Sequence, residues 1–215
     1  DRPAFRNVVV NGLVLAEDGK KMSKRLKNYP DPSLILEKYG ADALRLYMMK
    51  SPAVHGEELR FTERYLVEDM RAVLLPLWNA YQFFTSYANI DGFNPSHWKN
   101  APAVAKRPRI DQWILALLRE TELSVHQEME AYELANVFPH LARFLENLTN
   151  WYIRLNRSRY WEAKGESFSE DKLSAYATLF EVLDRFGMLL APYLPYFAEY
   201  LHSALHPNQT HSHLG

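Results

Sequence analysis

Apolar residues recur at three- and four-residue spacing over most of the chain, and this spacing constrains the fold more than any other feature. It runs from Thr62 to Leu205, with one interruption at 89–108, a stretch rich in Pro, Asn and Gly. Such spacing places the apolar side chains on one face of a helix, which must bury that face against neighbouring helices. The sequence therefore predicts a mainly α protein, an antiparallel helical bundle preceded by a small α/β segment.

Turn and cap signals divide this pattern into separate helices. Ser33 and Ser169 are the expected N-caps of two of them, and Gly40 is expected just past the end of the first. Pro76 and Pro139 should each kink or interrupt a longer helix. The predicted helices span 33–39, 41–49, 62–88, 109–131, 133–161, 170–190 and 193–205.

A basic loop lies ahead of the helices. The run from Val8 to Leu15 is typical of a β-strand, and the pair Asp18-Gly19 predicts a sharp turn after it. The next nine residues, Lys20 to Asn28, include five lysines and arginines. Ammonium groups on flexible stems suit a polyphosphate whose charge moves during a reaction. A charge run alone is more often a solvated surface turn.

The residues of this loop carry a family resemblance. The segment Lys21-Met22-Ser23-Lys24-Arg25 is similar to the KMSKS signature of class I aminoacyl-tRNA synthetases, with Arg25 where that family more often has Ser. The flanking segments 11–15, 27–32 and 39–47 resemble isoleucyl-tRNA synthetases. A valyl or other class Ia synthetase, or a non-catalytic RNA-binding helical module, remains as an alternative.

The resemblance implies an enzyme that activates isoleucine with ATP and Mg²⁺ and transfers it to isoleucine tRNA. Lys24 would be catalytic, stabilising charge on the phosphates. The expected ATP-binding residues are Lys21, Met22, Ser23, Lys24 and Arg25. The chain contains no HIGH-type histidine motif and no amino-acid pocket of that family, so we expect a C-terminal fragment that is inert alone.

The resemblance also implies three domains. Residues 1–30 would be the C-terminal end of a Rossmann-type catalytic domain, residues 31–61 a stem-contact fold, and residues 62–215 the helical anticodon-binding domain.

The segment from Asn150 to Trp161 is the second candidate site. It holds three arginines and four aromatic residues and no acid, and unstacked RNA bases are held by guanidinium planes and aromatic faces. Helical spacing puts Arg154, Arg157 and Trp161 on one side and lets Trp151, Tyr152 and Leu155 face the core. The segment resembles an element of the isoleucyl anticodon-binding domain. The predicted tRNA-binding residues are Arg154, Arg157, Arg159, Trp161 and Lys27.

Other features exclude some classes of protein. The chain has no cysteine, so disulfide frameworks and cysteine-based metal sites are excluded. His202 and His206 lie four residues apart but complete no H-E-x-x-H pattern, so we expect surface histidines and no metal site. The net charge of −1 requires any RNA contact to come from local patches. No apolar run reaches the length of a membrane span, and we expect a cytoplasmic monomer.

Overall fold

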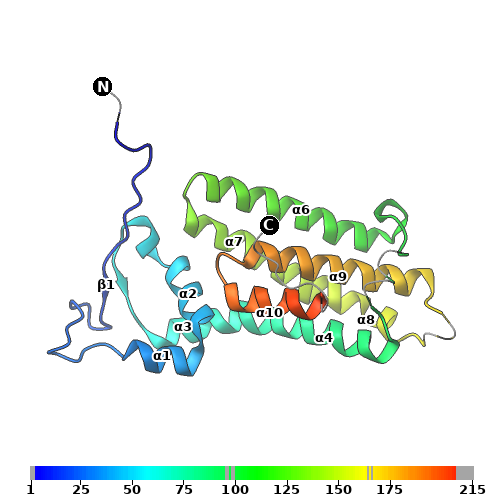
Figure 1. Cartoon of the computed structure of the whole chain (residues 1–215), viewed down its shortest axis with the longest axis horizontal. Helices are drawn as coiled ribbons and strands as arrows, with labels where there is room; N and C mark the ends of the chain where they lie inside the picture. Colours follow the sequence, from blue (N-terminus) through cyan, green and yellow to red (C-terminus); the bar gives the residue numbers. More distant parts are fainter. Residues whose placement is uncertain (1–2, 95–96, 98–99, 164, 166, 207–215) are drawn as a thin grey trace.

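The fold has a small N-terminal part beside a bundle of long helices (Figure 1). The computed structural model describes residues 3–94, 97, 100–163, 165 and 167–206. Within these residues the protein is mainly α, as the apolar spacing predicts. None of the described helices is long and apolar enough to cross a membrane.

The N-terminal part is built around two short parallel strands. β1 pairs with β2 so that Val14 lies opposite Leu59 and Leu15 opposite Arg60. The strand expected over 8–15 forms only at its last two residues, because β2 is equally short and no other described strand pairs with the exposed residues before β1. The elements of this part are β1 (Val14–Leu15), α1 (Pro32–Tyr39), α2 (Ala41–Lys50), a 3₁₀ turn η1 (Pro52–His55) and β2 (Leu59–Arg60). Their small core consists of Ile35, Ala43, Tyr47, Ala53, Leu59, Phe61 and Leu66.

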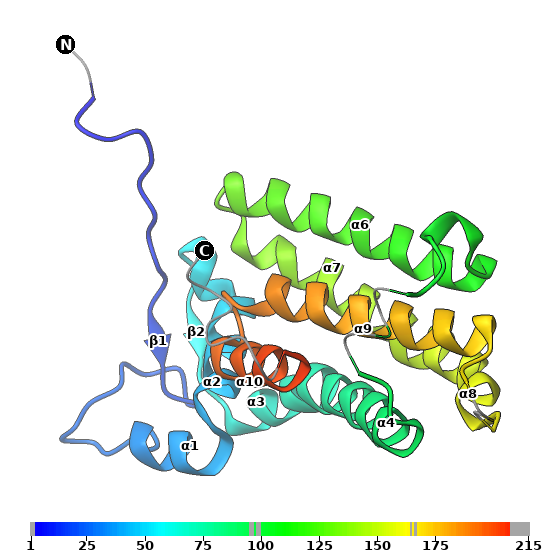
Figure 2. The same cartoon turned by 45° about the vertical axis from the view of Figure 1, so that its right-hand side comes forward.

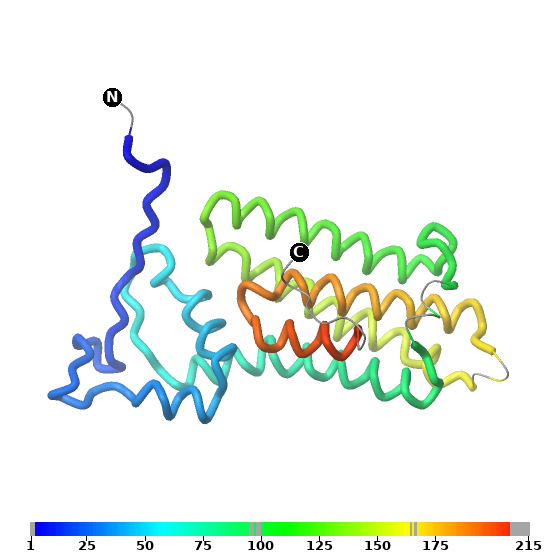
Figure 3. The backbone as a smooth tube through the Cα atoms, in the orientation of Figure 1, coloured from blue at the N-terminus to red at the C-terminus, as the bar shows by residue number. Residues whose placement is uncertain are grey.

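The bundle follows, and its successive long helices alternate in direction (Figures 1 and 3). α9 (Glu170–Leu190) lies at its centre, in contact with four other helices, α4 (Leu75–Asp91), α6 (Arg109–Glu130), α8 (Arg154–Trp161) and α10 (Pro195–Leu205). It is buried on nearly every side, which explains its run of small and apolar residues from Ser174 to Leu183. The elements are α3 (Glu63–Asp69), η2 (Met70–Leu74), α4 (Leu75–Asp91), η3 (Val104–Lys106), α6 (Arg109–Glu130), α7 (Leu134–Glu146), η4 (Asn147–Ile153), α8 (Arg154–Trp161), α9 (Glu170–Leu190) and α10 (Pro195–Leu205).

The helix caps are only partly those expected. Ser169 caps α9, accepting a hydrogen bond from the backbone N–H of Lys172 at 3.2 Å. The prediction for α1 is wrong, because Asp31 rather than Ser33 is the N-cap, and its carboxylate accepts the Ser33 N–H at 2.9 Å. Pro32 explains the difference, since its fixed φ and missing N–H suit the first helical position and so place the cap at Asp31, two residues earlier than predicted. Gly40 ends α1 with φ of 83°, as expected.

Two segments of π-helix, η2 and η4, interrupt the longer helices. η2 ends at Leu74, two residues before Pro76, so the helix expected over 62–88 consists of two α-helices joined by a π turn. The helix expected over 133–161 runs through Pro139 without ending and changes to π geometry only at Asn147. The helix is therefore not interrupted at Pro139, and the change in helix type lies eight residues later. The alternative, a bend at Pro139, stays a prediction.

The π turn at η4 also changes which residues face the core. Trp151 and Leu155 are 56% and 61% exposed, whereas Tyr152 and Tyr160 are buried. The expected inward position of Trp151 and Leu155 is therefore wrong. A π turn accommodates about one extra residue, which rotates all later residues by roughly 100° about the axis relative to a continuous α-helix.

A junction joins the N-terminal part to the bundle through α2 and α10, which lie side by side (Figure 2). The Asp42 carboxylate, on α2, accepts the backbone N–H of Tyr196 at 3.3 Å and that of Phe197 at 2.7 Å. It thus caps the N-terminus of α10 from another helix. Arg45 completes the junction by donating to the carbonyl oxygen of Pro192 at 2.8 Å.

Replacing Asp42 with alanine should lower the free energy of unfolding by about 1–2 kcal/mol, because the first N–H groups of α10 lose a charged acceptor in a nearly buried position. Urea denaturation followed by circular dichroism measures the change. Glu37→Ala, at an exposed position of α1, is the control and should stay within about 0.5 kcal/mol of the unchanged chain. Equal stabilities for the two variants would contradict a capping role for Asp42.

Candidate functional site

The basic loop is a closed turn held by the Asn28 side chain. The side-chain oxygen of Asn28 accepts the Ser23 N–H at 2.9 Å, and its side-chain nitrogen donates to the Lys21 carbonyl oxygen at 3.2 Å. A backbone hydrogen bond from Lys27 N–H to Ser23 oxygen closes the turn at 2.9 Å. Lys27 has φ of 47°, a left-handed conformation that is uncommon for a side chain other than glycine. The loop therefore has a defined shape rather than being an extended run of charges.

The cations of this loop point into solvent. Lys21, Lys24, Arg25 and Lys27 are exposed, and none of them forms an ion pair with a described residue. Lys20 differs, because its ammonium lies 3.2 Å from the carboxylate of Asp18. Four positive side chains that pair with no acid in the described part of the chain, on one short turn, can attract a polyanion such as the phosphates of a nucleotide.

Met22 and Ser23 anchor the loop to the body of the protein. The Met22 side chain packs against the small N-terminal core, next to Val14. Ser23 is half-buried, and its backbone N–H and C=O are both used in the turn. This placement favours a positioning role for both residues. Direct contact of Met22 or Ser23 with ATP stays a prediction.

Three of the predicted tRNA-binding residues share an exposed side of α8. Arg154, Arg157 and Trp161 lie at spacings of three and four residues, and neither arginine forms an ion pair with a described residue. The Trp161 ring is 63% exposed, and its Nε1–H donates to the Tyr87 hydroxyl at 2.8 Å. Trp151 is exposed at the start of the same side. We call Trp151, Arg154, Arg157 and Trp161 the arginine–tryptophan face.

A groove with a volume of about 620 Å³ adjoins this face. It lies between the α4 helix, with Asn79 and Phe83, and the η4–α8 segment, with Asn150 and Arg157. Both π segments contribute to its walls, η2 through Ala72 and η4 through Asn150 among others. The groove combines an aromatic ring, two amides and a guanidinium, which are groups that can stack on and hydrogen-bond to a base.

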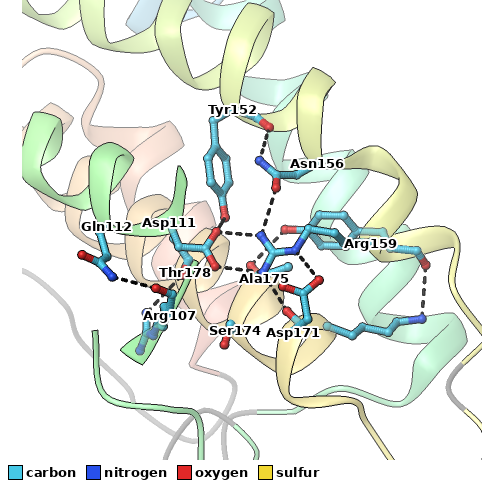
Figure 4. Close-up of polar contacts among 12 residues, drawn as sticks. Arg107, Asp111, Gln112, Tyr152, Asn156, Arg159, Asp171, Ser174, Ala175 and Thr178 are labelled. Atoms are coloured by element: carbon cyan, nitrogen blue, oxygen red, sulfur yellow. Dashed lines mark hydrogen bonds and ion pairs between the residues drawn. The ribbon is translucent and has the colours of Figure 1, made fainter. Parts of the chain in front are cut away.

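Arg159 has a different environment, shown in Figure 4. Its guanidinium donates to both carboxylate oxygens of Asp111, at 2.8 and 2.9 Å, and to a carboxylate oxygen of Asp171 at 2.9 Å. Only 12% of the side chain is exposed. The Tyr152 hydroxyl donates to the same Asp111 carboxylate at 2.7 Å. These contacts join α6, η4, α8 and α9, so the structure favours a stabilising role for Arg159 over contact with RNA.

The electrostatics of this cluster agree with its burial. Burial raises the pKa of Tyr152 well above its usual value, and the nearby Tyr160 and Asp111 raise it further. Burial alone would lower the pKa of Arg159, but the hydrogen bonds with Asp111 and Asp171 outweigh it and raise that pKa. Tyr152 therefore stays neutral and Arg159 stays charged throughout the physiological range.

Sequence reasoning missed the roles of Asn28 and Asp111. Asn28 lies in the quoted loop, and an asparagine next to a turn is a known signal for a side-chain hydrogen bond to the backbone. Asp111 carried no such signal, because its partners are 41 and 48 residues away. The expectation of surface histidines at 202 and 206 is wrong, since their side chains are only 11% and 19% exposed.

Two protein-family models match the chain. Residues 1–60 match the model of class I tRNA synthetases for isoleucine, leucine, methionine and valine, and residues 111–214 match the model of the anticodon-binding domain of tRNA ligases. The first match contains the basic loop and the second contains the arginine–tryptophan face.

Similar curated proteins indicate which of these four synthetases the chain resembles. The chain is 52% identical to an isoleucine–tRNA ligase of Bdellovibrio bacteriovorus over 91% of its own length and 18% of the relative. It is 45% identical to an isoleucine–tRNA ligase of Protochlamydia amoebophila over 95% of its length and 19% of the relative. The chain thus spans about a fifth of the length of the curated relatives it matches. These matches do not favour the valyl alternative.

Solved structures share the fold. Methionyl-tRNA synthetase of Mycobacterium tuberculosis, in complex with methionyl-adenylate, is similar over 89% of this chain and 36% of its own, with a TM-score of 0.73 and 19% identity. A leucyl synthetase of Agrobacterium radiobacter K84 in a ternary complex with tRNA is similar over 93% of this chain and 22% of its own, with a TM-score of 0.60 and 19% identity. With the two family models matched in order and isoleucine–tRNA ligases at 45% to 52% identity over more than nine-tenths of its length, this chain belongs to the isoleucine–tRNA ligase family of class I synthetases.

Proposed function

We propose that this chain works as part of an isoleucine–tRNA ligase in the cytoplasm, where it supplies the phosphate loop of the ATP site and the surface that binds the anticodon arm of isoleucine tRNA. The observation that carries this proposal is the closed basic loop, in which four exposed cations have no ion-pair partner among the described residues. In this proposal residues 1–30 belong to the catalytic domain, 31–61 to the stem-contact fold and 62–215 to the anticodon-binding domain.

The loop suits the activation step of this reaction. The isoleucine carboxylate attacks the α-phosphate of ATP, and pyrophosphate leaves with additional negative charge. Lys24 and Lys21, with their exposed ammonium groups, would stabilise that charge, and Arg25 keeps a positive charge where the family more often has Ser. Mg²⁺ bound with ATP would neutralise part of the same charge. The isoleucine pocket lies outside this chain in the proposal, so we expect the chain alone to form no adenylate.

The arginine–tryptophan face suits the recognition of tRNA. Its two guanidinium groups have no ion-pair partner among the described residues, and its two indole rings are more than half exposed. Exposed indoles that stack on no ring among the described residues are available to anticodon bases, and the arginines are available to phosphates.

A titration against isoleucine tRNA tests the proposal. The chain is titrated with an isoleucine tRNA transcript, and with the same transcript carrying another anticodon, at two salt concentrations. We expect tighter, salt-sensitive binding to the isoleucine anticodon. Equal binding of both transcripts would limit this face to phosphate contacts, and no binding of either would contradict a tRNA-binding role for the chain alone.

Replacing Arg154 and Arg157 together with alanine should weaken binding of the isoleucine transcript about tenfold or more. The slope of log K against log salt should fall by about 1.4–1.8, because each lost phosphate contact removes about 0.7–0.9. Titrations at four or more salt concentrations measure the slope. Lys106→Ala with Arg119→Ala is the control, since it removes the same charge from exposed positions away from this face. Identical slopes for the two double variants would place the RNA contacts elsewhere.

A further inference from the structure

Two histidines and one aspartate meet between α9 and α10. Asp184 lies on α9, His202 lies on α10, and His206 is the residue that directly follows the last residue of α10. Oδ1 of Asp184 is 2.8 Å from Nε2 of His206 and 3.6 Å from Nδ1 of His202. The two imidazole rings are 4.5 Å apart between centroids. One potential metal-ligating atom from each residue lies within 4.8 Å of the others.

The two helices approach each other closely beside this cluster. Gly187 faces Leu201, and a Cβ atom at Gly187 would lie only 2.8 Å from a methyl carbon of Leu201. Gly187 is one turn from Asp184, and Leu201 is the neighbour of His202 in the chain. The close approach lets the short side chain of Asp184 reach both histidines. The three side chains are 11% to 20% exposed, so the backbone of both helices and the surrounding packing hold them in place.

The donor set suits a zinc ion. Zn²⁺ binds imidazole nitrogen and carboxylate oxygen at about 2.0–2.2 Å, so tetrahedral ligand atoms lie about 3.3–3.6 Å from one another. The separations of 2.8 and 3.6 Å from Asp184 to the two histidines bracket this range. Two histidines four residues apart in the sequence are a known spacing for zinc ligands, and here the second one follows the last residue of the helix. Three protein ligands leave a fourth position that a water molecule can fill.

The imidazole nitrogens of both histidines converge on one carboxylate oxygen, that of His206 at 2.8 Å and that of His202 at 3.6 Å. Three potential ligand atoms that converge in a largely buried position suit a shared cation. We propose that Asp184, His202 and His206 bind one Zn²⁺ ion, which fastens α10 to α9. This site lies apart from the basic loop and the arginine–tryptophan face, and it is independent of the proposed function.

Zinc binding by the 215-residue chain tests this proposal. The chain is treated with a chelator, dialysed, and titrated with Zn²⁺ against a chromophoric competitor. We expect one ion per chain. At free zinc one hundred times the Kd, the Tm should rise by about 5–10 °C, because the ion binds only the folded state. Mg²⁺ should not replace Zn²⁺, since it prefers six oxygen ligands.

The variants His202→Gln, His206→Asn and Asp184→Asn identify the ligands. Each should weaken zinc binding by about one hundredfold or more, since loss of a group that only supports a ligand already costs 10–100-fold. His126→Gln, at an exposed position of α6, is the matched control and should bind as the unchanged chain does. Circular dichroism without metal checks that each variant folds, and His206→Asn remains informative if the more buried His202 variant does not.

Two results would overturn the proposal. One is the failure of the unchanged chain to retain one ion per molecule. The other is loss of binding in a His211→Gln, His213→Gln variant while His206→Asn still binds, which would assign the ion to those two histidines, which lie outside the described residues.

Discussion

Replacing Asp111 with alanine lowers the free energy of unfolding by about 3–5 kcal/mol, the loss typical of breaking a buried ion pair. The Asp111 carboxylate is fully buried and is the acceptor for Arg159 and for the Tyr152 hydroxyl. Without it, a nearly buried guanidinium loses the partner that offsets its desolvation, and the hydroxyl loses its acceptor. Urea denaturation of the variant measures the loss, which is a large part of the 5–15 kcal/mol that stabilises an ordinary domain.

Two further variants show that the effect comes from the buried charge. Tyr152→Phe removes only the hydroxyl and should cost about 0.5–1.5 kcal/mol. Asp171→Ala removes the half-exposed partner of the same arginine and should cost about 1 kcal/mol or less. If Asp111→Ala fails to fold, these two variants still rank the contacts. A loss for Asp111→Ala no greater than that for Asp171→Ala would contradict the stabilising role of the cluster.

Replacing Lys24 with alanine in a full-length enzyme carrying this sequence lowers the rate of adenylate formation about 10²–10³-fold, the range for loss of one charge-stabilising group in a transition state. The affinity for isoleucine tRNA should stay nearly unchanged, because Lys24 lies between β1 and α1 and the arginine–tryptophan face lies on η4 and α8. Pyrophosphate exchange measures the rate, and the tRNA titration measures the affinity. An unaltered exchange rate would contradict the catalytic role of Lys24.

Asn28→Ala separates the shape of the loop from its charge. This change keeps all the cations but removes the two side-chain hydrogen bonds that close the turn. We expect a smaller loss than for Lys24→Ala, because the ammonium groups remain and only their placement is loosened. Lys106→Ala, at an exposed position near α6, is the control and should leave the exchange rate unchanged. Equal losses for Asn28→Ala and Lys24→Ala would indicate that placement, not charge, limits the reaction.

The local pattern of the sequence was enough to predict the fold class and most helices. Apolar spacing and the Ser169 cap gave α6 and α9 to within a residue or two, because both depend on neighbours in the chain. The prediction of a strand over 8–15 is mostly wrong, because a strand depends on a distant partner strand, which the local pattern does not specify. The prediction of which side chains after Asn147 face the core is also wrong in part. A π turn has more residues per turn than the constant α-helical period on which that prediction depends.

The candidate sites were predictable as segments but not residue by residue. The loop at 21–25 and the segment at 150–161 are both predicted from their composition and from their similarity to sequence motifs of the synthetases. Composition could not separate Arg157, which forms no ion pair with any residue that the structure describes, from Arg159, which is held by Asp111. That difference depends on a residue 48 positions earlier. The Asp184, His202 and His206 cluster was missed for the same reason, since one of its members lies on a different helix.

The π turn at η4 bears on how the sequences of relatives should be aligned. A relative that lacks one residue there and continues as an α-helix would keep the later residues on the same sides, because the π turn holds that one extra residue. Buried Tyr160 and exposed Arg157 would then keep their surroundings. A relative of equal length without the π turn would instead turn everything after it by roughly 100°, although no residue type in α8 had changed. Conservation of those residues in an alignment without a gap would consequently not imply conservation of the surface they form. The length of the segment between Glu146 and Arg154 is therefore as informative for comparing relatives as the identity of the arginines themselves.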